Sequence, residues 1–217
     1  NALLDQTGFI LRFSNTGQRL WATYFGGPDS DNNFSVTTDA LGNAWVVSTT
    51  LSTAMPVANP GGGAYYQGVS PSGGLNSELF ISKFSSANVQ IWGTWYGAAA
   101  GSPGGPYNIG ITANSSNGIY IACQNFTATN PTLNPGGGAY YSGTSAAANG
   151  SVFIMEFDAL QVRRWATYYE GAFATSVAVD NTSGCLYITG EWQVLGYTNV
   201  NPGGAYQQAY AGDHASF

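Results

Sequence analysis

Eleven carboxylates and a single histidine are the side chains of this 217-residue chain that could move protons. Glu156 and Asp158 lie two positions apart at one predicted strand, and Asp180 and Glu191 bracket a predicted hairpin. Glycoside cleavage needs two carboxyl groups facing each other at a set separation, which spacing along a strand does not provide. The histidine, His214, lies near the end of the sequence, and there is no Gly-x-Ser-x-Gly motif, so a Ser-His-Asp arrangement is not indicated. The sequence predicts a protein that is not an enzyme, with no catalytic residues and no cofactor.

Oxygen-bearing side chains occupy alternate positions at Asp29, Asp31 and Asn33, the spacing of a loop that wraps a Ca²⁺ ion. No glutamate follows at the distance of a bidentate ligand, and the corresponding segments further along, 98–100 and 172–174, carry alanine and phenylalanine. A turn held by Asp and Asn side chains explains the same residues. The sequence predicts no metal site, and Ca²⁺ binding at these three residues stays open.

Six tryptophans could stack against sugar rings. Trp21, Trp92 and Trp165 recur at one phase of a repeat, which favours packing between repeats, where an aromatic side chain buries about 150–250 Å². Trp95 and Trp192 depart from that phase and are the candidates for exposed rings that contact a ligand. Glycans are the ligands that such rings would bind.

The composition limits the partners and the setting. Five basic against eleven acidic residues make a phosphate-binding surface hard to build, so nucleic acid is not an expected partner. No apolar run reaches the roughly 18 residues of a membrane span. A coat of uncharged polar residues favours an extracellular or cell-surface protein, and the 44% of hydrophobic residues predicts a folded one. Cys123 and Cys185 are predicted to be small buried residues rather than a disulfide.

The elements that would position these side chains come from one unit that occurs three times. Each unit is predicted to hold two hairpins, because β-branched and aromatic segments alternate with turns of Asn, Gly, Ser and Asp. The repeats span about 8–68, 79–143 and 152–210, and 211–217 are the lead-in to a further strand. The recurring residues are Phe13, Phe84 and Phe157; Trp21, Trp92 and Trp165; Trp45, Tyr120 and Tyr187; and Pro60, Pro135 and Pro202.

Two further features recur with the repeat. Arg12, Lys83 and Glu156 occupy one equivalent strand position, and because it accepts either sign of charge we expect a solvated rim. An Asn-Pro-Gly-Gly segment follows the second hairpin of each unit, beginning at Asn59, Asn134 and Asn201. Proline fixes the entry and glycine permits left-handed backbone, so these segments are predicted to be shaped loops whose tyrosines fold back between units.

Four antiparallel strands per unit, repeated without helices to cover them, favour an all-β fold of β-propeller-type blades: three four-stranded repeats plus the start of a fourth. The segment 34–50, preceded by Leu20-Trp-Ala-Thr-Tyr-Phe-Gly-Gly and followed by Pro-Gly-Gly-Gly-Ala-Tyr-Tyr, resembles the SBBP (beta-propeller) repeats of secreted and surface proteins. The resemblance covers nearly the whole chain and implies a propeller at the cell surface, with no established activity. The family's Asp before the hairpin turn matches Asp39 and Asp180 and falls on Ala113 in the second unit.

Closed propellers typically have four to eight blades, so three units leave exposed strand edges. The expected partner is the protein itself, in a head-to-tail closed ring or open filament, or further blades of a longer chain. The function expected is that of a non-enzymatic extracellular structural protein that self-assembles through open blade edges. The alternative is a carbohydrate- or protein-binding propeller module of a larger surface adhesin, with Trp95, Trp192 and the Asn-Pro-Gly-Gly loops as the contact face.

Overall fold

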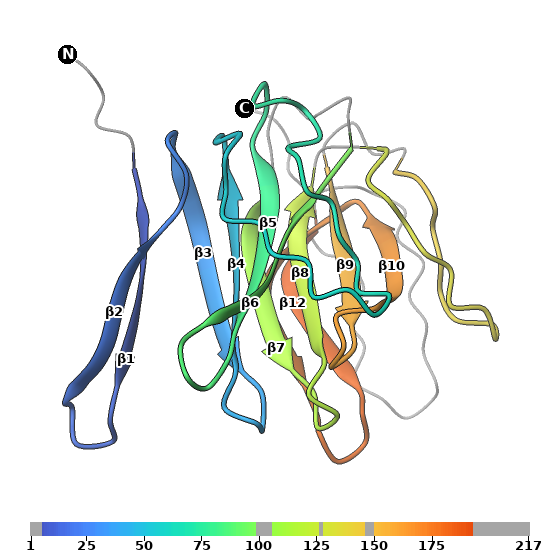
Figure 1. The fold of residues 1–217 in the computed structure, drawn as a ribbon. Helices are drawn as coiled ribbons and strands as arrows, with labels where there is room; N and C mark the ends of the chain where they lie inside the picture. Colours follow the sequence, from blue (N-terminus) through green and yellow to red (C-terminus); the bar gives the residue numbers. More distant parts are fainter. Residues whose placement is uncertain (1–5, 99–105, 126–127, 146–149, 193–217) are drawn as a thin grey trace, which may run out of the picture.

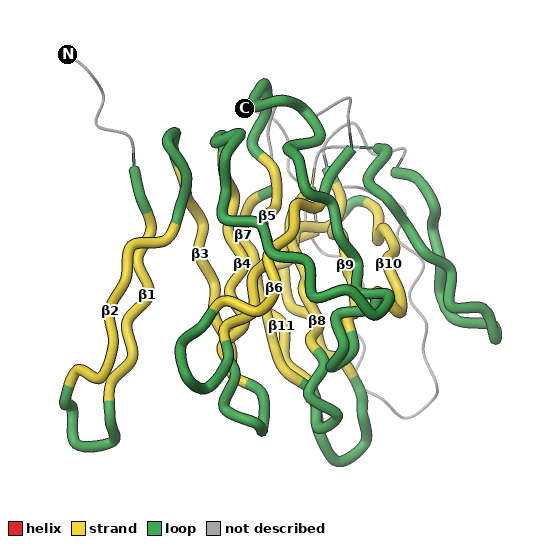
Figure 2. Tube along the Cα trace, viewed as in Figure 1, coloured by secondary structure: helices red, strands yellow, loops and turns green. Residues whose placement is uncertain are grey.

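The computed structural model describes residues 6–98, 106–125, 128–145 and 150–192, and all regular structure among them is β-strand (Figure 1, Figure 2). No helix in these ranges is long and apolar enough to cross a membrane. The strands are β1 (Gly8–Phe13), β2 (Arg19–Phe25), β3 (Asp31–Thr38), β4 (Ala44–Thr50), β5 (Glu78–Phe84), β6 (Gln90–Tyr96), β7 (Tyr107–Ala113), β8 (Ile119–Asn125), β9 (Ser151–Phe157), β10 (Arg163–Glu170), β11 (Ala172–Val179) and β12 (Leu186–Trp192).

The strands form two four-stranded sheets and two hairpins, all antiparallel. The first hairpin is β1–β2, the first sheet has the order β3-β4-β5-β6, the second sheet β7-β8-β9-β10, and the last hairpin is β11–β12. The predicted hairpins are therefore present, and the all-β class is confirmed. The described strands do not close into a barrel or a ring, so the propeller arrangement stays a prediction.

The sheets are offset from the predicted repeats by half a unit. Each four-stranded sheet takes its first two strands from one repeat and its last two from the next, because β4 pairs with β5 and β8 with β9. A repeating sequence defines the length of its period but not where the folded unit begins. The repeats at 8–68, 79–143 and 152–210 are thus sequence units, and the four-stranded units are 31–96 and 107–170.

The hairpins and sheets lie face to face in chain order, as Figure 1 shows from β1–β2 to β3–β6 and on to β7–β10. Each interface between layers is a separate apolar cluster. The middle cluster joins the two sheets, a second joins the first hairpin to the first sheet, and a third joins the second sheet to the last hairpin. This layered packing buries the central strands of each four-stranded sheet, β4 with β5 and β8 with β9, on both faces.

Aromatic pairs repeat from one interface to the next. Trp92 meets Phe157 of the second sheet at a centroid distance of 5.4 Å, and Trp21 meets Phe84 of the first sheet at 5.7 Å. Trp45 is packed edge-on against Trp92 at 5.8 Å. The recurring tryptophans therefore lie between layers, as their phase in the sequence predicts, since ring pairs at 4.5–7 Å stabilise beyond their burial.

The two described Asn-Pro-Gly-Gly loops share one geometry. Asn59 Oδ1 accepts the Gly61 N–H and Asn134 Oδ1 accepts the Gly136 N–H, and Gly61–Gly63 and Gly136–Gly138 all have positive φ. After the first loop Tyr65 folds back between the sheets, with centroid distances of 5.0 Å to Tyr96 and 6.0 Å to Phe157. This confirms the predicted return of the tyrosine for the first loop. The third loop, from Asn201, lies outside the described residues.

Candidate functional site

The carboxylates that could suggest catalysis hold the sheet and its turns together. Asp158 Oδ1 accepts the N–H groups of Leu160 and Val162, and its Oδ2 lies 2.7 Å from an Arg164 nitrogen. Burial raises the pKa of Glu156, while a hydrogen bond from Tyr120 opposes that shift. Both carboxylates line a shallow groove with Arg164, and His214 lies outside the described residues. Asp158 therefore holds the β9–β10 turn, Glu156 hydrogen-bonds with Tyr120 on the neighbouring strand, and Glu191 lines a separate groove along β12.

Glu156→Gln is expected to stabilise the protein at pH 7. The folded-state pKa of Glu156 is raised above its usual 4.5. Between the usual and the raised pKa the native state binds more protons than the unfolded state, so the free energy of unfolding falls as pH rises through this range. Removing the charge should gain up to about 1 kcal/mol at pH 7 after allowance for solvent screening. Urea unfolding at pH 7 and pH 3 checks this, because at pH 3 the carboxyl is protonated in both states and the gain should vanish. A gain that persists at pH 3 would contradict the electrostatic cause.

The Ca²⁺ candidates do not converge. Asp31 is buried and turns back to accept the Gly27 N–H at 2.9 Å, and burial raises its pKa. Asp29 is exposed, and its own N–H is bonded to Ser52 Oγ. The side chain of Asn33 lies outside what is described. Within the described ranges no three His, Cys, Asp or Glu side chains gather as metal ligands, so a loop-closing role explains Asp31.

The prediction that Trp95 is an exposed, ligand-contacting ring is wrong. Trp95 is 1% exposed and packs edge-on against Phe80 at 5.2 Å, inside the cluster beneath the first hairpin. It is paired with Phe80 in the strand register just as Tyr24 is paired with Phe9 and Tyr168 with Phe153, so it belongs to the repeat rather than departing from it. The structure describes the backbone of Trp192, at the end of β12, but not its side chain.

Both cysteines are free thiols, as expected. Cys123 is buried in the middle cluster, and burial raises its pKa to about 12. Cys185 is exposed at the β11–β12 turn, which corrects its predicted burial. A turn residue faces solvent even where its strand neighbours pack.

A charged cluster occupies the junction of β4 and β5. Lys83 Nζ lies 3.8 Å from Asp39 Oδ2 and 4.2 Å from the ring centroid of Trp45, and it donates to Ala159 O in the next sheet at 3.1 Å. Lys83 is buried, so the predicted solvated rim is wrong at this repeat. The Lys83 side chain spans two layers. Its ammonium tolerates burial because the Asp39 carboxylate compensates the charge.

Asp39 also holds the β3–β4 turn. Its Oδ1 accepts the N–H groups of Leu41 and Asn43, and its Oδ2 accepts from Asn43 Nδ2 and Trp45 Nε1. Burial on its own raises the pKa of Asp39, but these hydrogen bonds and the Lys83 charge outweigh it and leave the pKa below its usual value. Asp39 is therefore ionised at neutral pH. It stabilises the β3–β4 turn and also compensates the charge of Lys83 at the β4–β5 junction.

The second sheet has the same junction with different charges. Asn114 takes the place of Asp39, because its Oδ1 accepts the N–H groups of Ser116 and Gly118 across the β7–β8 turn. The residue of the second repeat that corresponds to Asp39 is therefore Asn114, one position after the Ala113 with which the sequence comparison matched it. Glu156 stands opposite Tyr120, as Lys83 stands opposite Trp45. Tyr120 hydrogen-bonds with both Glu156 and Asn114, so at this junction the carboxylate shares its tyrosine partner with a neutral amide.

The third copy of the junction is divided between the two ends of the structure. Asp180 holds the β11–β12 turn through the Thr182 N–H and Ser183 Oγ, and these hydrogen bonds lower its pKa. Arg12 lies on β1 and donates to Ser86 O at 2.7 Å and to Asn88 Oδ1. Its contact with the next β-turn repeats that of Lys83 with Ala159. Arg12 is therefore placed as Lys83 is, on a strand that has no β4 equivalent beside it among the described strands.

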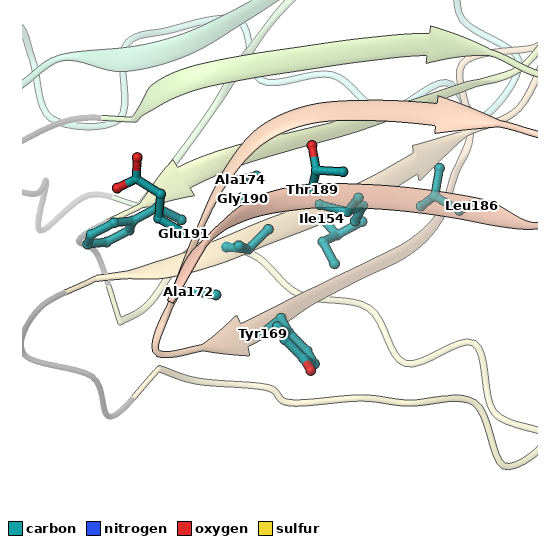
Figure 3. Close-up of a pocket in the computed structure, with 11 residues that line it drawn as sticks. Ile154, Tyr169, Ala172, Ala174, Leu186, Thr189, Gly190 and Glu191 are labelled. Atoms are coloured by element: carbon teal, nitrogen blue, oxygen red, sulfur yellow. The ribbon is translucent and has the colours of Figure 1, made fainter. Parts of the chain in front are cut away.

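A groove lies beside each of the two hairpins, which are half-formed sheets as far as the described strands go. The groove along β12 faces β9 and β10, with Ile154, Tyr169, Leu186 and Gly190 around it (Figure 3). The groove along β1 faces β3 and β4 and is lined chiefly by Phe9, Leu11, Phe34 and Val36. The first hairpin also exposes a row of large apolar side chains: Phe9, Leu11, Phe13, Leu20 and Tyr24. These two ends form the candidate functional site, an interface.

No family model matches the chain, and no curated protein shows significant similarity to it. The resemblance to SBBP repeats therefore stays a prediction, and the geometry of the sheets carries the functional argument.

Proposed function

We propose that this chain is a non-enzymatic structural protein that assembles with copies of itself through its two half-formed sheets. The observation that carries the proposal is the exposed apolar row on β1 and β2. In the first sheet the equivalent residues Phe80, Phe84 and Trp95 are buried under the preceding layer. An uncovered row of this kind marks an interaction surface.

The arrangement of layers supports a propeller-type assembly. The strand that starts each four-stranded sheet contacts the strand that starts the next, since β3 packs on β7 and β7 packs on β11. Blades arranged about an axis bring their innermost strands together in this way. Copies added at both ends extend the series into a closed ring or an open filament, according to whether the rotation between them closes.

The setting proposed is extracellular or at the cell surface. Only 7% of the residues in the chain are charged, so its surface relies on Ser, Thr, Asn, Gly and Tyr for solubility. Such surfaces approach closely because few ions must be desolvated.

Sedimentation velocity of the purified chain over a hundredfold range of concentration tests this proposal. We expect the mass to increase with concentration to dimers or larger species. A monomer at every concentration would contradict self-assembly.

A second candidate is a carbohydrate- or protein-binding module of a larger adhesin. The observation in its favour is the exposure of Tyr66, Tyr140 and Tyr141 beside the Asn-Pro-Gly-Gly loops, where rings could stack on sugars. A glycan array distinguishes the two functions. Selective binding lost on replacing Tyr66 and Tyr141 by alanine would favour the module, and no binding would leave assembly as the function.

A further inference from the structure

We propose that β12 of one copy pairs antiparallel with β1 of a second copy, so that the last hairpin and the first hairpin together form a four-stranded sheet locked by Asp180 and Arg12. The inference rests on the proposed function, self-assembly, and adds the strands, the register and the charged pair. The occupant of each end is a second copy of this chain.

The register follows from the two junctions inside the chain. In β4–β5, Trp45 stands opposite Lys83 and Val47 opposite Ile81, and in β8–β9, Tyr120 stands opposite Glu156. Transfer of this pairing places Tyr187 opposite Arg12 of the second copy and Ile188 opposite Leu11. A slip of one residue would turn every side chain of β12 to the other face, so this register is specific.

The charges at the ends complement each other. Inside the chain one junction pairs the base Lys83 with the acid Asp39. The other brings the acid Glu156 and the amide Asn114 to a shared partner, Tyr120. The divided junction holds Asp180 at one end and Arg12 at the other. Joining the ends gives the acid and base combination of the first sheet, with the Arg12 guanidinium over the Tyr187 ring as Lys83 lies over Trp45.

The aromatic contacts between layers also continue across the join. Phe25 packs on Phe80 at 6.2 Å and Tyr96 on Phe153 at 5.8 Å, and the next members of these series are Tyr169 and the second copy's Phe9. A second series consists of Trp21 on Phe84 and Trp92 on Phe157. Its next member would be Trp165 on the second copy's Phe13. The exposed row on the first hairpin would thereby be covered.

The two grooves fit this arrangement reciprocally. The outer pair of the joined sheet, β1–β2 of the second copy, lies in the groove beside β12 that faces β9 and β10. The inner pair, β11–β12 of the first copy, lies in the groove beside β1 that faces β3 and β4. Each end is thus the counterpart of the other, and one contact joins both.

Charge variants matched to the chain's own junctions test the pair. Arg12→Glu sets a carboxylate against Asp180 and should weaken association by on the order of 30-fold or more, since a mispaired buried charge is costly. Asp180→Asn alone keeps the turn, as Asn114 does, and should weaken it less. Arg12→Glu with Asp180→Asn recreates the Glu156 and Asn114 combination and should recover most of the loss. Sedimentation velocity measures all of these against the wild type.

Disulfide trapping tests the register. In a Cys185→Ser background, Leu11→Cys with Ile188→Cys should form a disulfide between copies under mild oxidation, because these residues face each other in the proposed pairing. Leu11→Cys with Thr189→Cys is the matched control, with the second thiol on the opposite face. Non-reducing gels should show cross-linked species for the first pair only: a dimer alone for a two-chain ring and a ladder for a filament.

The outcomes separate the two proposals. Charge rescue together with the in-register cross-link supports the β12–β1 sheet. Assembly that is indifferent to Arg12→Glu, or that cross-links equally in the control, would overturn this interface while self-assembly stands. A wild-type chain that stays monomeric would show that β1 and β12 are not joined between copies, and would overturn both proposals.

Discussion

Phe157→Ala is expected to lower the free energy of unfolding by about 3–5 kcal/mol, the usual loss for a buried phenylalanine. Phe157 is 0% exposed and lies where both sheets meet, in contact with Trp92, Tyr65 and Tyr96. Its removal leaves three rings around a cavity that strand backbones cannot collapse to fill. Urea unfolding followed by tryptophan fluorescence measures the loss.

Phe13→Ala is the matched control, because Phe13 holds the same position of the repeat on the first hairpin. It is 54% exposed, so its truncation should cost less than about 1 kcal/mol at concentrations where the chain is monomeric. Association at higher concentration should nevertheless weaken, since the proposed partner of Phe13 lies in the second copy. Equal destabilisation by the two substitutions would contradict the layered account of the fold.

Asp39→Ala is expected to destabilise the protein by about 3–5 kcal/mol at pH 7, because it leaves the buried Lys83 ammonium without its counter-charge. The change also removes the acceptor for the Leu41 and Asn43 N–H groups and for Trp45 Nε1. Denaturant unfolding at pH 7 measures the loss.

Asp39→Asn isolates the turn hydrogen bonds that Oδ1 accepts. The amide keeps this acceptor, as Asn114 does in the second sheet, but it loses the charge and places an NH2 group where Oδ2 accepts from Asn43 Nδ2 and Trp45 Nε1. The cost should therefore be smaller than that of alanine, at about 1–3 kcal/mol. The stability due to the Asp39 charge is present above its unfolded pKa and is lost as pH falls through the lowered folded value. If the alanine and asparagine variants are equally stable, the turn hydrogen bonds contribute nothing.

The strands were predictable because each is a short β-branched or aromatic segment between turn residues. The first hairpin of the second repeat, for example, consists of two such segments and is found at β5 and β6. The phase of the sheets was not predictable. Pairing of β4 with β5 is decided by how a loop of 27 residues, 51–77, returns the chain, and local propensity carries no information about that.

The candidate site was only partly predictable. Open strand edges follow from counting three units, but the roles that we propose for Arg12 and Asp180 do not, because they come from a comparison of the junctions between strands. The sequence shows Arg12, Lys83 and Glu156 at one position, and only the register shows Lys83 opposite Trp45 and Glu156 opposite Tyr120. Trp95 was misjudged for the same reason, since its burial depends on the layer above it.

Electron cryomicroscopy of the assembled chain, at a resolution that separates strands, tests self-assembly most directly. The account predicts an unbroken series of four-stranded sheets in which every third sheet combines β11–β12 of one copy with β1–β2 of the next. Particles that contain a single copy, with the two hairpins apart and no sheet shared between chains, would contradict it.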